Sequence, residues 1–354
     1  FWPGGDRDGN PFGSVDTTLQ GASSLRDVLL QCYYQDFRNL RRRISFSGVY
    51  EDLMAIEKMV LRCIRHQDEW DFKMFRSSLH KVLNDLHEHH DSIFVELVEE
   101  LLDRVALFGS HFASIDVRQD SREIKRAFDA VADQLGLEVP STPEELFALD
   151  AHWEGTLTGD DRIDDTLQSF RVIREIQAKN GPKGAHRYII SNCRGAMDVA
   201  RVFALARWTA FGDEKISVDI VPLFETIDDL VGAGASMNTL YSETNYRRHL
   251  TQRGNKQTIM LGFSDGTKDG GYMSANWNIY RAKENLTRIS KLNDIDVVFF
   301  DGRGGPPARG GGNTHNFYAS LGQQIASSEI QLTVQGQTIS SNFGTSESAQ
   351  FNME

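Results

Sequence analysis

Cysteine and proline are both scarce in this chain of 354 residues, which holds 3 cysteines and 8 prolines. The cysteines, Cys32, Cys63 and Cys193, stand far apart, which excludes a disulfide framework and the close cysteine pairs of a zinc site. Few prolines and 40% hydrophobic residues also exclude a disordered chain. We therefore expect a folded protein with a large core in a reducing compartment, by default the cytoplasm.

Long apolar runs and an excess of positive charge are missing as well. No apolar run reaches the roughly 18 residues of a membrane-spanning helix, so we expect no membrane segment. The formal net charge of -12 at pH 7 disfavours nucleic acid and anionic membranes as partners. An anionic substrate would therefore need a local basic pocket. The first residues resemble neither a signal peptide nor a start, so we expect the chain to begin inside a longer one.

Helical spacing of apolar residues characterises residues 24–107 and predicts three or four long helices. Two polar clusters lie in this region. The basic run Arg41–Arg43 is interpreted as a solvated helix end, where cations suit the helix dipole, rather than as an anion site. The histidines within residues 87–90 are interpreted as a wet helix surface, because no carboxylate completes a metal-binding motif.

After this region, short β-branched or apolar runs alternate with helical stretches, which is typical of a parallel sheet. The runs are Phe112–Val117, Tyr188–Ser191, Ile216–Phe224, Thr258–Phe263 and Ile295–Phe300. With strands near Trp2 and Leu332, seven strands of a (β/α)8 barrel can be placed. We predict an α/β fold, an incomplete TIM-like barrel with a large helical insertion. Residues 1–23 hold a barrel strand and a loop, 24–107 the insertion, and 108–354 the barrel strands, helices and catalytic loops.

Polar and charged side chains directly follow the predicted strands. In a parallel barrel all these strand ends lie on one rim, where active sites form. Carboxylates are hard ligands for a divalent cation, and arginines hold anions through charge-assisted hydrogen bonds. The set predicts a site for a cation and a phosphorylated carboxylate, although Glu225 or Asp265 alone could equally cap a helix. Its members are Arg118, Glu225, Asp265, Lys268, Asp301 and Arg303.

Residues 302–312 contain six glycines, two arginines and two prolines, so they cannot lie inside a helix or strand. Glycine lets backbone N–H groups approach an oxyanion, and Arg303 and Arg309 can each hold an anionic group. The segment predicts a phosphate or bicarbonate loop rather than a flexible tip that carries arginines by chance.

This loop resembles the glycine-rich catalytic loop of the phosphoenolpyruvate carboxylase family in Gly302–Gly305 and Arg309–Gly311. Four other segments are similar to family motifs in the same order. Residues 2–11 resemble W-x-G-G-D-R-D-G-N-P, 115–119 L-D-I-R-Q, 221–230 V-P-L-F-E-T-x-D-D-L, and 262–270 G-Y-S-D-S-x-K-D-A. The resemblance extends from Trp2 to about Gly344.

The resemblance implies a lyase of the phosphoenolpyruvate/pyruvate barrel type that fixes carbon dioxide and supplies oxaloacetate to the tricarboxylic acid cycle. Its substrates would be phosphoenolpyruvate and bicarbonate, its cofactor Mg²⁺ or Mn²⁺, and its assembly an allosteric homotetramer inhibited by a dicarboxylate. The implied metal ligands are Glu225 and Asp265; the catalytic residues Lys268, Arg303, Arg309 and Asp301; and the substrate-binding residues Arg118, Arg303, Gly304, Gly305, Trp2, Arg7 and Gln335.

Three departures from the family pattern bear on activity. Asp301 stands where the family loop has a histidine, and residues 333–337 read T-V-Q-G-Q in place of T-E-Q-G-E. The family's T-A-H-P segment belongs upstream of Trp2, and its helical C-terminal part beyond Glu354. We therefore expect this piece to be inactive alone.

Two other functions stay open at this point. A non-catalytic barrel module for assembly or ligand sensing is compatible with Asp301 and the altered 333–337 segment. Another enolate-forming metal barrel, such as an aldolase or lyase, explains the carboxylates but not the glycine-arginine loop.

Overall fold

The computed structural model describes residues 2–10, 12–66, 70–155, 157–212, 214–262, 264–302, 314–325, 328–334 and 336–353; at 66, 264–269, 314–315 and 337 it describes the backbone alone. The chain divides into two compact units. The first comprises Phe1–Val117 and Gln168–His186, and the second Arg118–Leu167 and Arg187–Glu354. Within the described ranges, no helix combines the length and apolarity that crossing a membrane requires.

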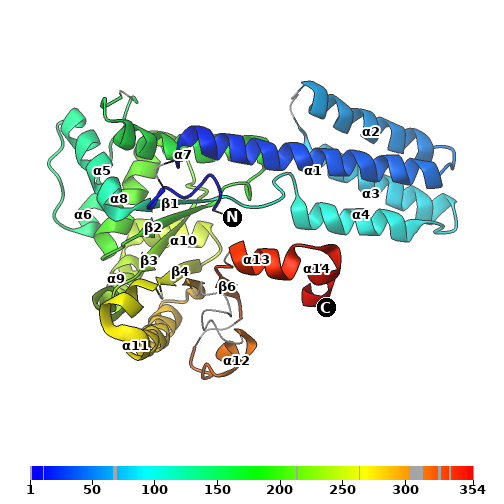
Figure 1. The fold of residues 1–354 in the computed structure, drawn as a ribbon. Coiled ribbons are helices and arrows are strands. Elements are labelled where there is room, and N and C mark those ends of the chain that lie inside the picture. Colours follow the sequence, from blue (N-terminus) through cyan, green and yellow to red (C-terminus); the bar gives the residue numbers. More distant parts are fainter. Residues whose placement is uncertain are drawn as a thin grey trace. The chain divides into compact units, whose positions relative to one another are not determined.

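Four long helices make up most of the first unit (Figure 1). They are α1 (Val15–Arg43), α2 (Val49–His66), α3 (Phe72–His89) and α4 (Val95–Phe108). Ser14 starts α1 with a capping box, in which its hydroxyl accepts from the Thr17 amide. The apolar stripes of the helices meet in one core, where Phe37 and Phe75 are fully buried and their rings meet edge to face. The helix α1 begins earlier than the predicted insertion.

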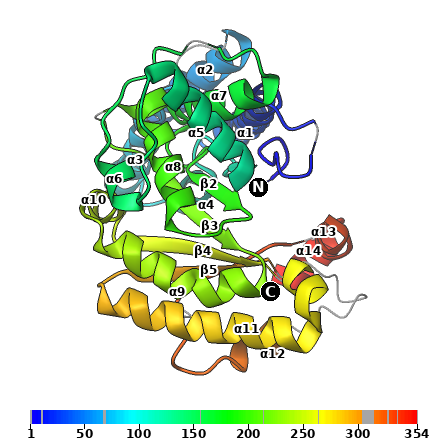
Figure 2. The ribbon, with the colours of Figure 1, turned by 90° about the vertical axis from the view of Figure 1, so that its left-hand side faces the viewer.

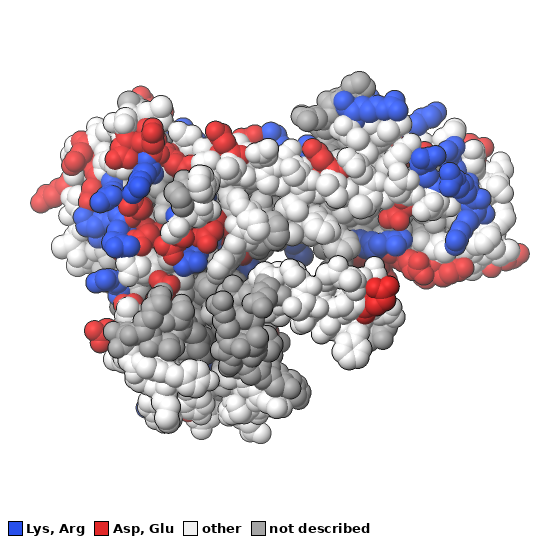
Figure 3. All heavy atoms as spheres, in the orientation of Figure 1, with Lys and Arg blue, Asp and Glu red and all other residues white. Residues whose placement is uncertain are grey.

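The polar clusters of this unit are engaged in local contacts. Arg41 forms an ion pair of 2.8 Å with Glu57, His87 lies 2.9 Å from the Ser92 hydroxyl, and the His90 ring stacks on Phe46. Lys and Arg side chains lie on the surface of the helices (Figure 3). No group of three His, Cys, Asp or Glu residues could hold a metal ion anywhere in the described part of the chain. Arg41–Arg43 lie in the last turn of α1, which agrees with the interpretation of this run as a helix end.

The N-terminal residues form a turn directly after Trp2, near which the sequence predicts a strand. The Trp2 carbonyl accepts hydrogen bonds from the amides of Gly5 at 2.9 Å and Asp6 at 3.1 Å, and Gly4 has a φ of 83°. Within residues 2–10 only Asp6 makes an isolated bridge. Glycine permits this turn, and the strand near Trp2 stays a prediction.

Six strands form one sheet in chain order, β1-β2-β3-β4-β5-β6, and every pairing from β2 to β6 is parallel. The inner strands are nearly continuous in buried apolar residues, as sheets covered on both faces require. Their bounds are β1 Asp116–Asp120, β2 Arg187–Ser191, β3 Asp219–Phe224, β4 Lys256–Gly262, β5 Asp296–Gly302 and β6 Ile330–Leu332. The predicted α/β class with a parallel sheet is confirmed, and closure into a barrel remains a prediction.

Helices alternate with the strands and cover the sheet, with α9 and α11 packed side by side (Figure 2). After β1 come α5 (Ser121–Leu135), α6 (Pro143–Ala148) and α7 (Asp161–Asn180), and after β2 come α8 (Ala196–Ala206) and a π-helical turn, η1 (Arg207–Phe211). The later helices are α9 (Ile227–Ser242), α10 (Thr244–Gln252), α11 (Ser264–Leu292), α12 (Thr314–Ala319), α13 (Gly336–Phe343) and α14 (Ser346–Met353). Each connection between parallel strands therefore leaves the carboxyl end of one strand and returns to the amino end of the next, so the carboxyl ends lie on one side.

His249 on α10 makes the second unit sensitive to acid. Burial lowers the pKa of His249 from 6.5 to about 4. The positive charges of Arg253 and Lys215 also lower this pKa, whereas the negative charge of Asp219 raises it. On acidification, His249 therefore becomes protonated in the unfolded chain at a higher pH than in the folded protein. The free energy of unfolding decreases as the pH falls from 6.5 toward 4. We predict that His249→Gln removes about 3 kcal/mol of this acid-dependent loss. Urea unfolding at pH 7 and pH 4 measures it; equal pH dependence in both proteins would contradict the prediction.

Candidate active site

The register of the parallel strands brings three carboxyl ends together in the second unit. Leu261 of β4 pairs with Phe224 of β3 and with Asp301 of β5. Gly262 and Gly302, the last residues of β4 and β5, are also paired. The chain segments that follow these strands therefore all leave from the carboxyl end of the sheet, which we call the strand-end edge. The sequence predicts an active-site rim at this position.

Glu225, directly after β3, is held by the two preceding strands. Its Oε2 accepts a hydrogen bond of 2.7 Å from the Asn192 amide, which follows β2. Its Oε1 lies 3.8 Å from Nη2 of Arg118 on β1, and the two side chains are 15% and 14% exposed. A predicted metal ligand and a predicted phosphate ligand thus lie side by side, and both remain partly accessible.

Residues that the sequence did not single out support this pair. Asn192 takes a left-handed φ of 53°, and its carbonyl accepts a 2.7 Å hydrogen bond from the Ser121 hydroxyl. A Cβ on Gly262 would lie 3.1 Å from Cγ of Glu225, so glycine leaves room for the carboxylate. The only sequence signal for Asn192 is a polar residue after a buried strand.

Asp198, in the first turn of α8, and Asp120, the last residue of β1, have pKa values shifted in opposite directions. Burial raises the pKa of Asp198, and hydrogen bonds from the Arg194 amide and Arg201 only partly offset this. Burial also acts to raise the pKa of Asp120, but hydrogen bonds from Arg122 outweigh it and lower that pKa. The edge thus combines arginine-paired carboxylates with the Arg118–Glu225 pair.

Several predicted site residues lie beyond what the structure describes. Asp265 and Lys268 fall in the first turns of α11, directly after β4, where the backbone alone is described. Because α11 starts just after β4, the backbone of both residues lies close to the carboxyl end of that strand. Outside the described residues lie Arg303, Gly304, Gly305, Arg309 and Gln335.

The predicted substrate residues Trp2 and Arg7 belong to the first unit. Arg7 is 9% exposed, and its guanidinium donates to the Gly5 carbonyl at 3.2 Å and to the Thr18 hydroxyl at 3.1 Å. These bonds brace the turn in which Arg7 lies. A role for Trp2 and Arg7 in substrate binding stays a prediction.

Asp301, at the end of β5, is fully buried in a cluster of charged and aromatic side chains. Its Oδ2 lies 2.7 Å from Nζ of Lys283 on α11 and accepts a 2.6 Å hydrogen bond from the Tyr318 hydroxyl on α12. The ammonium also lies 5.4 Å from the centre of the Phe299 ring and 5.7 Å from that of Phe317. The sequence predicted a catalytic Asp301 and did not single out Lys283, whose signal is its place on the apolar stripe of α11.

The family model for phosphoenolpyruvate carboxylase matches residues 1–73 and 65–354. The chain belongs to the phosphoenolpyruvate carboxylase family. It is 30% identical over 425 aligned residues to the phosphoenolpyruvate carboxylase of Rhodothermus marinus, 29% over 411 to that of Nitrosomonas europaea and 28% over 420 to that of Gloeobacter violaceus. Each alignment covers 100% of this chain but 44–45% of the relative. The chain thus spans less than half the length of these carboxylases.

The chemistry of the described carboxylate fits the divalent cation that this family relationship implies. Glu225 offers carboxylate oxygens at the strand-end edge, which suit the hard ions Mg²⁺ and Mn²⁺. Both of its oxygens face other groups, the Asn192 amide and Arg118, so its orientation is fixed. Fixed orientation is what a preorganised ligand requires.

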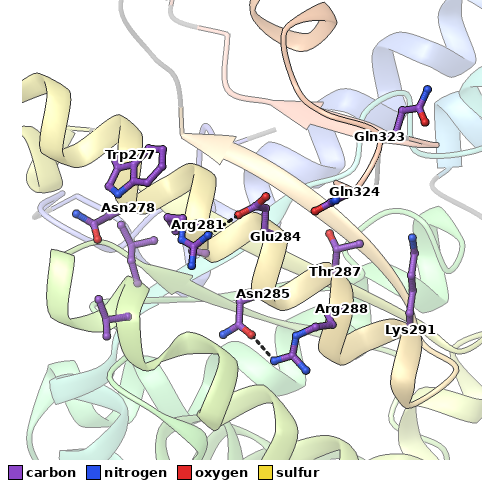
Figure 4. Close-up of a pocket in the computed structure, with 13 residues that line it drawn as sticks. Trp277, Asn278, Arg281, Glu284, Asn285, Thr287, Arg288, Lys291, Gln323 and Gln324 are labelled. Carbon is purple, nitrogen blue, oxygen red and sulfur yellow. Dashed lines mark hydrogen bonds and ion pairs between the residues drawn. The ribbon is translucent and has the colours of Figure 1, made fainter.

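A separate hollow of about 990 Å³ lies along the exposed face of α11, against α9 (Figure 4). Arg281 is bonded to Glu284 and Arg288 to Asn285, so these two cations are held by neighbours on their own helix. Arg118, Glu225 and Asp301 do not line this hollow. It is therefore distinct from the strand-end site of the carboxylase fold.

The Lys283–Asp301 pair yields a stability prediction. Lys283→Met removes the cation and leaves the buried carboxylate of Asp301 without its ion pair. Breaking a buried ion pair on one side costs about 3–5 kcal/mol. We predict a loss of this size in the free energy of unfolding, measured by urea denaturation. Lys291→Met, at an exposed site on the same helix, is the matched control, and equal losses in the two variants would contradict the prediction.

Proposed function

We propose that the strand-end edge of the second unit carries the phosphoenolpyruvate carboxylase reaction, in which phosphoenolpyruvate and bicarbonate give oxaloacetate and phosphate. The observation that carries the proposal is the placement of Arg118 beside Glu225, an anion ligand next to a metal ligand at neighbouring strand ends. The relatives, each more than twice as long, are named for this activity. Because the chain covers less than half of each relative, the activity is proposed for the protein that contains these residues.

Two carboxylates would hold the metal. Glu225 and Asp265 follow neighbouring parallel strands, so both positions lie at the carboxyl end of the sheet. Bound there, Mg²⁺ or Mn²⁺ supplies Lewis-acid stabilisation of negative charge on oxygen. Arg118 orients the Glu225 carboxylate and presents a guanidinium to the phosphate of the substrate.

The remaining predicted residues would act on the substrate. Arg303 joins Arg118 at the phosphate, and Lys268 and Arg309 neutralise charge on the reacting groups. A bicarbonate oxygen attacks phosphorus, the bond from phosphorus to the enol oxygen breaks, and carboxyphosphate and the enolate of pyruvate form. Carbon dioxide released from carboxyphosphate then bonds to the enolate carbon and gives oxaloacetate. Substrate contacts are proposed for Trp2, Arg7, Gly304, Gly305 and Gln335.

Regulation and assembly follow from the family relationship as further proposals. The longer protein would be a cytoplasmic homotetramer that is inhibited by a dicarboxylate, with Arg309 in the inhibitor site. Its product would replenish the tricarboxylic acid cycle.

A non-catalytic barrel module is the second candidate function. The observation in its favour is that Asp301, at the position of the family histidine, is fully buried and paired with Lys283. A side chain held in this way does not move protons at the substrate. The altered segment 333–337 adds to this argument.

Oxaloacetate production separates the two functions. The gene product that contains these residues with their flanking sequence is assayed with phosphoenolpyruvate, bicarbonate and Mg²⁺ or Mn²⁺, coupled to malate dehydrogenase. The carboxylase proposal predicts turnover that needs all three components. No oxaloacetate from a folded protein would support the non-catalytic module.

Lys268→Ala tests the residue proposed to act at the enolate. We predict that turnover falls by at least about 1000-fold, since a cation aimed at developing negative charge is lost. Folding should be unaffected, as judged by circular dichroism and melting temperature. Lys215→Ala, an exposed lysine of the same unit, is the matched control and should retain full turnover. Near-normal turnover of Lys268→Ala would refute the assigned role.

A further inference from the structure

Asp301 connects four parts of the second unit through one residue. Its carboxylate holds Lys283 of α11 and Tyr318 of α12. Its backbone carbonyl accepts a 3.0 Å hydrogen bond from the amide of Thr333, which follows β6. With its own place at the end of β5, Asp301 therefore fixes two strands and two helices against one another.

Three of the four connected parts, α11 and the ends of β5 and β6, carry or directly precede proposed catalytic or substrate-binding residues. The helix α11 begins directly after β4 and contains Asp265 and Lys268. Asp301 precedes Arg303 by two positions, and Thr333 precedes Gln335 by two. A shift of any one stretch relative to the others would change the distances between groups proposed to act on a single substrate.

The environment of Lys283 shows that this connection is made in an apolar interior. Lys283 is 1% exposed and Asp301 is 0% exposed, and the rings of Phe299, Phe317 and Tyr318 lie within 5.4–5.7 Å of the ammonium. A buried ion pair contributes little net stability compared with apolar side chains of the same volume. Its distinctive property is directional, because charge-assisted hydrogen bonds of 2.6–2.7 Å permit one arrangement of the partners.

The same geometry argues against Asp301 as a proton carrier. Both bonded groups approach Oδ2, and Oδ1 is buried without a hydrogen-bond partner among the described residues. Solvent does not reach the carboxylate, which is fully buried. A general acid or base must contact the substrate directly or through a water.

The geometry points to Asp301, Lys283 and Tyr318 as positioning residues that hold the β5 end, α11 and α12 in register for the carboxylase reaction. This inference rests on the proposed function and assigns roles to Lys283 and Tyr318 that the sequence did not predict. It replaces a chemical role for Asp301 with an indirect one.

Tyr318→Phe is the deciding variant, because it keeps the ring beside Lys283 and removes only the hydroxyl that bonds to Asp301. Misplacement by about 1 Å costs on the order of 100-fold in rate, so a smaller shift should lower kcat roughly tenfold. The assay uses the full gene product, at a temperature where circular dichroism shows the variant fully folded. KM for phosphoenolpyruvate should stay within about twofold of the wild-type value, because the variant should bind the substrate normally and slow only the chemical step. The matched control is Tyr272→Phe, an exposed tyrosine of α11, which should retain wild-type kcat.

Asp301→Asn separates positioning from proton transfer. It keeps an acceptor for Tyr318 and removes the ion pair. Positioning predicts measurable turnover, with kcat lowered by a similar factor across the pH profile. Loss of one limb of that profile would identify Asp301 as a proton carrier and overturn the inference.

Wild-type activity separates this inference from the proposed function. Absence of turnover in the folded wild-type protein would overturn both. An active wild type whose Tyr318→Phe variant shows unchanged kcat would overturn the inference alone. An active wild type with lowered kcat in Tyr318→Phe and unchanged kcat in Tyr272→Phe supports it.

Discussion

In-register parallel pairing of β3, β4 and β5 is the constraint on which the rest of the site depends. Parallel strands in chain order have all their carboxyl ends on one side of the sheet. Residues that directly follow different strands therefore lie close together although they are distant in sequence. Glu225 reaches Arg118 only because the ends of β1, β2 and β3 are neighbours. A one-residue slip of β4 would turn each of its side chains to the opposite face of the sheet and displace the start of α11.

A buried charge pair adds precision to this arrangement. The Lys283–Asp301 pair joins the helix after β4 to the end of β5, and Tyr318 adds the segment that follows. Apolar side chains could fill the same volume but would not select one geometry. The acid at the position of the family histidine is thus part of the scaffold, so its presence does not by itself argue against the proposed carboxylase activity.

Much of this organisation was predictable from the sequence, for reasons that differ by feature. Helical spacing predicted the helical region, and short apolar runs alternating with helical stretches predicted the parallel sheet. The polar residues after each strand predicted that Arg118 and Glu225 lie on one rim. The strand near Trp2 stays a prediction, since the described residues that follow it form a glycine-containing turn. Lys283 and Tyr318 escaped prediction because a buried pair is defined by contacts across 18 and 17 residues, which no local pattern encodes.

Binding of Mn²⁺ tests most directly whether the strand-end edge is a metal site built around Glu225. Electron paramagnetic resonance titration of the folded chain measures it, with Glu225→Gln compared against Glu138→Gln, a substitution at an exposed loop position of the same unit. We predict that Glu225→Gln weakens Mn²⁺ binding by at least about tenfold, whereas Glu138→Gln leaves the Mn²⁺ affinity unchanged. Equal Mn²⁺ affinity in the wild type and both variants would contradict it.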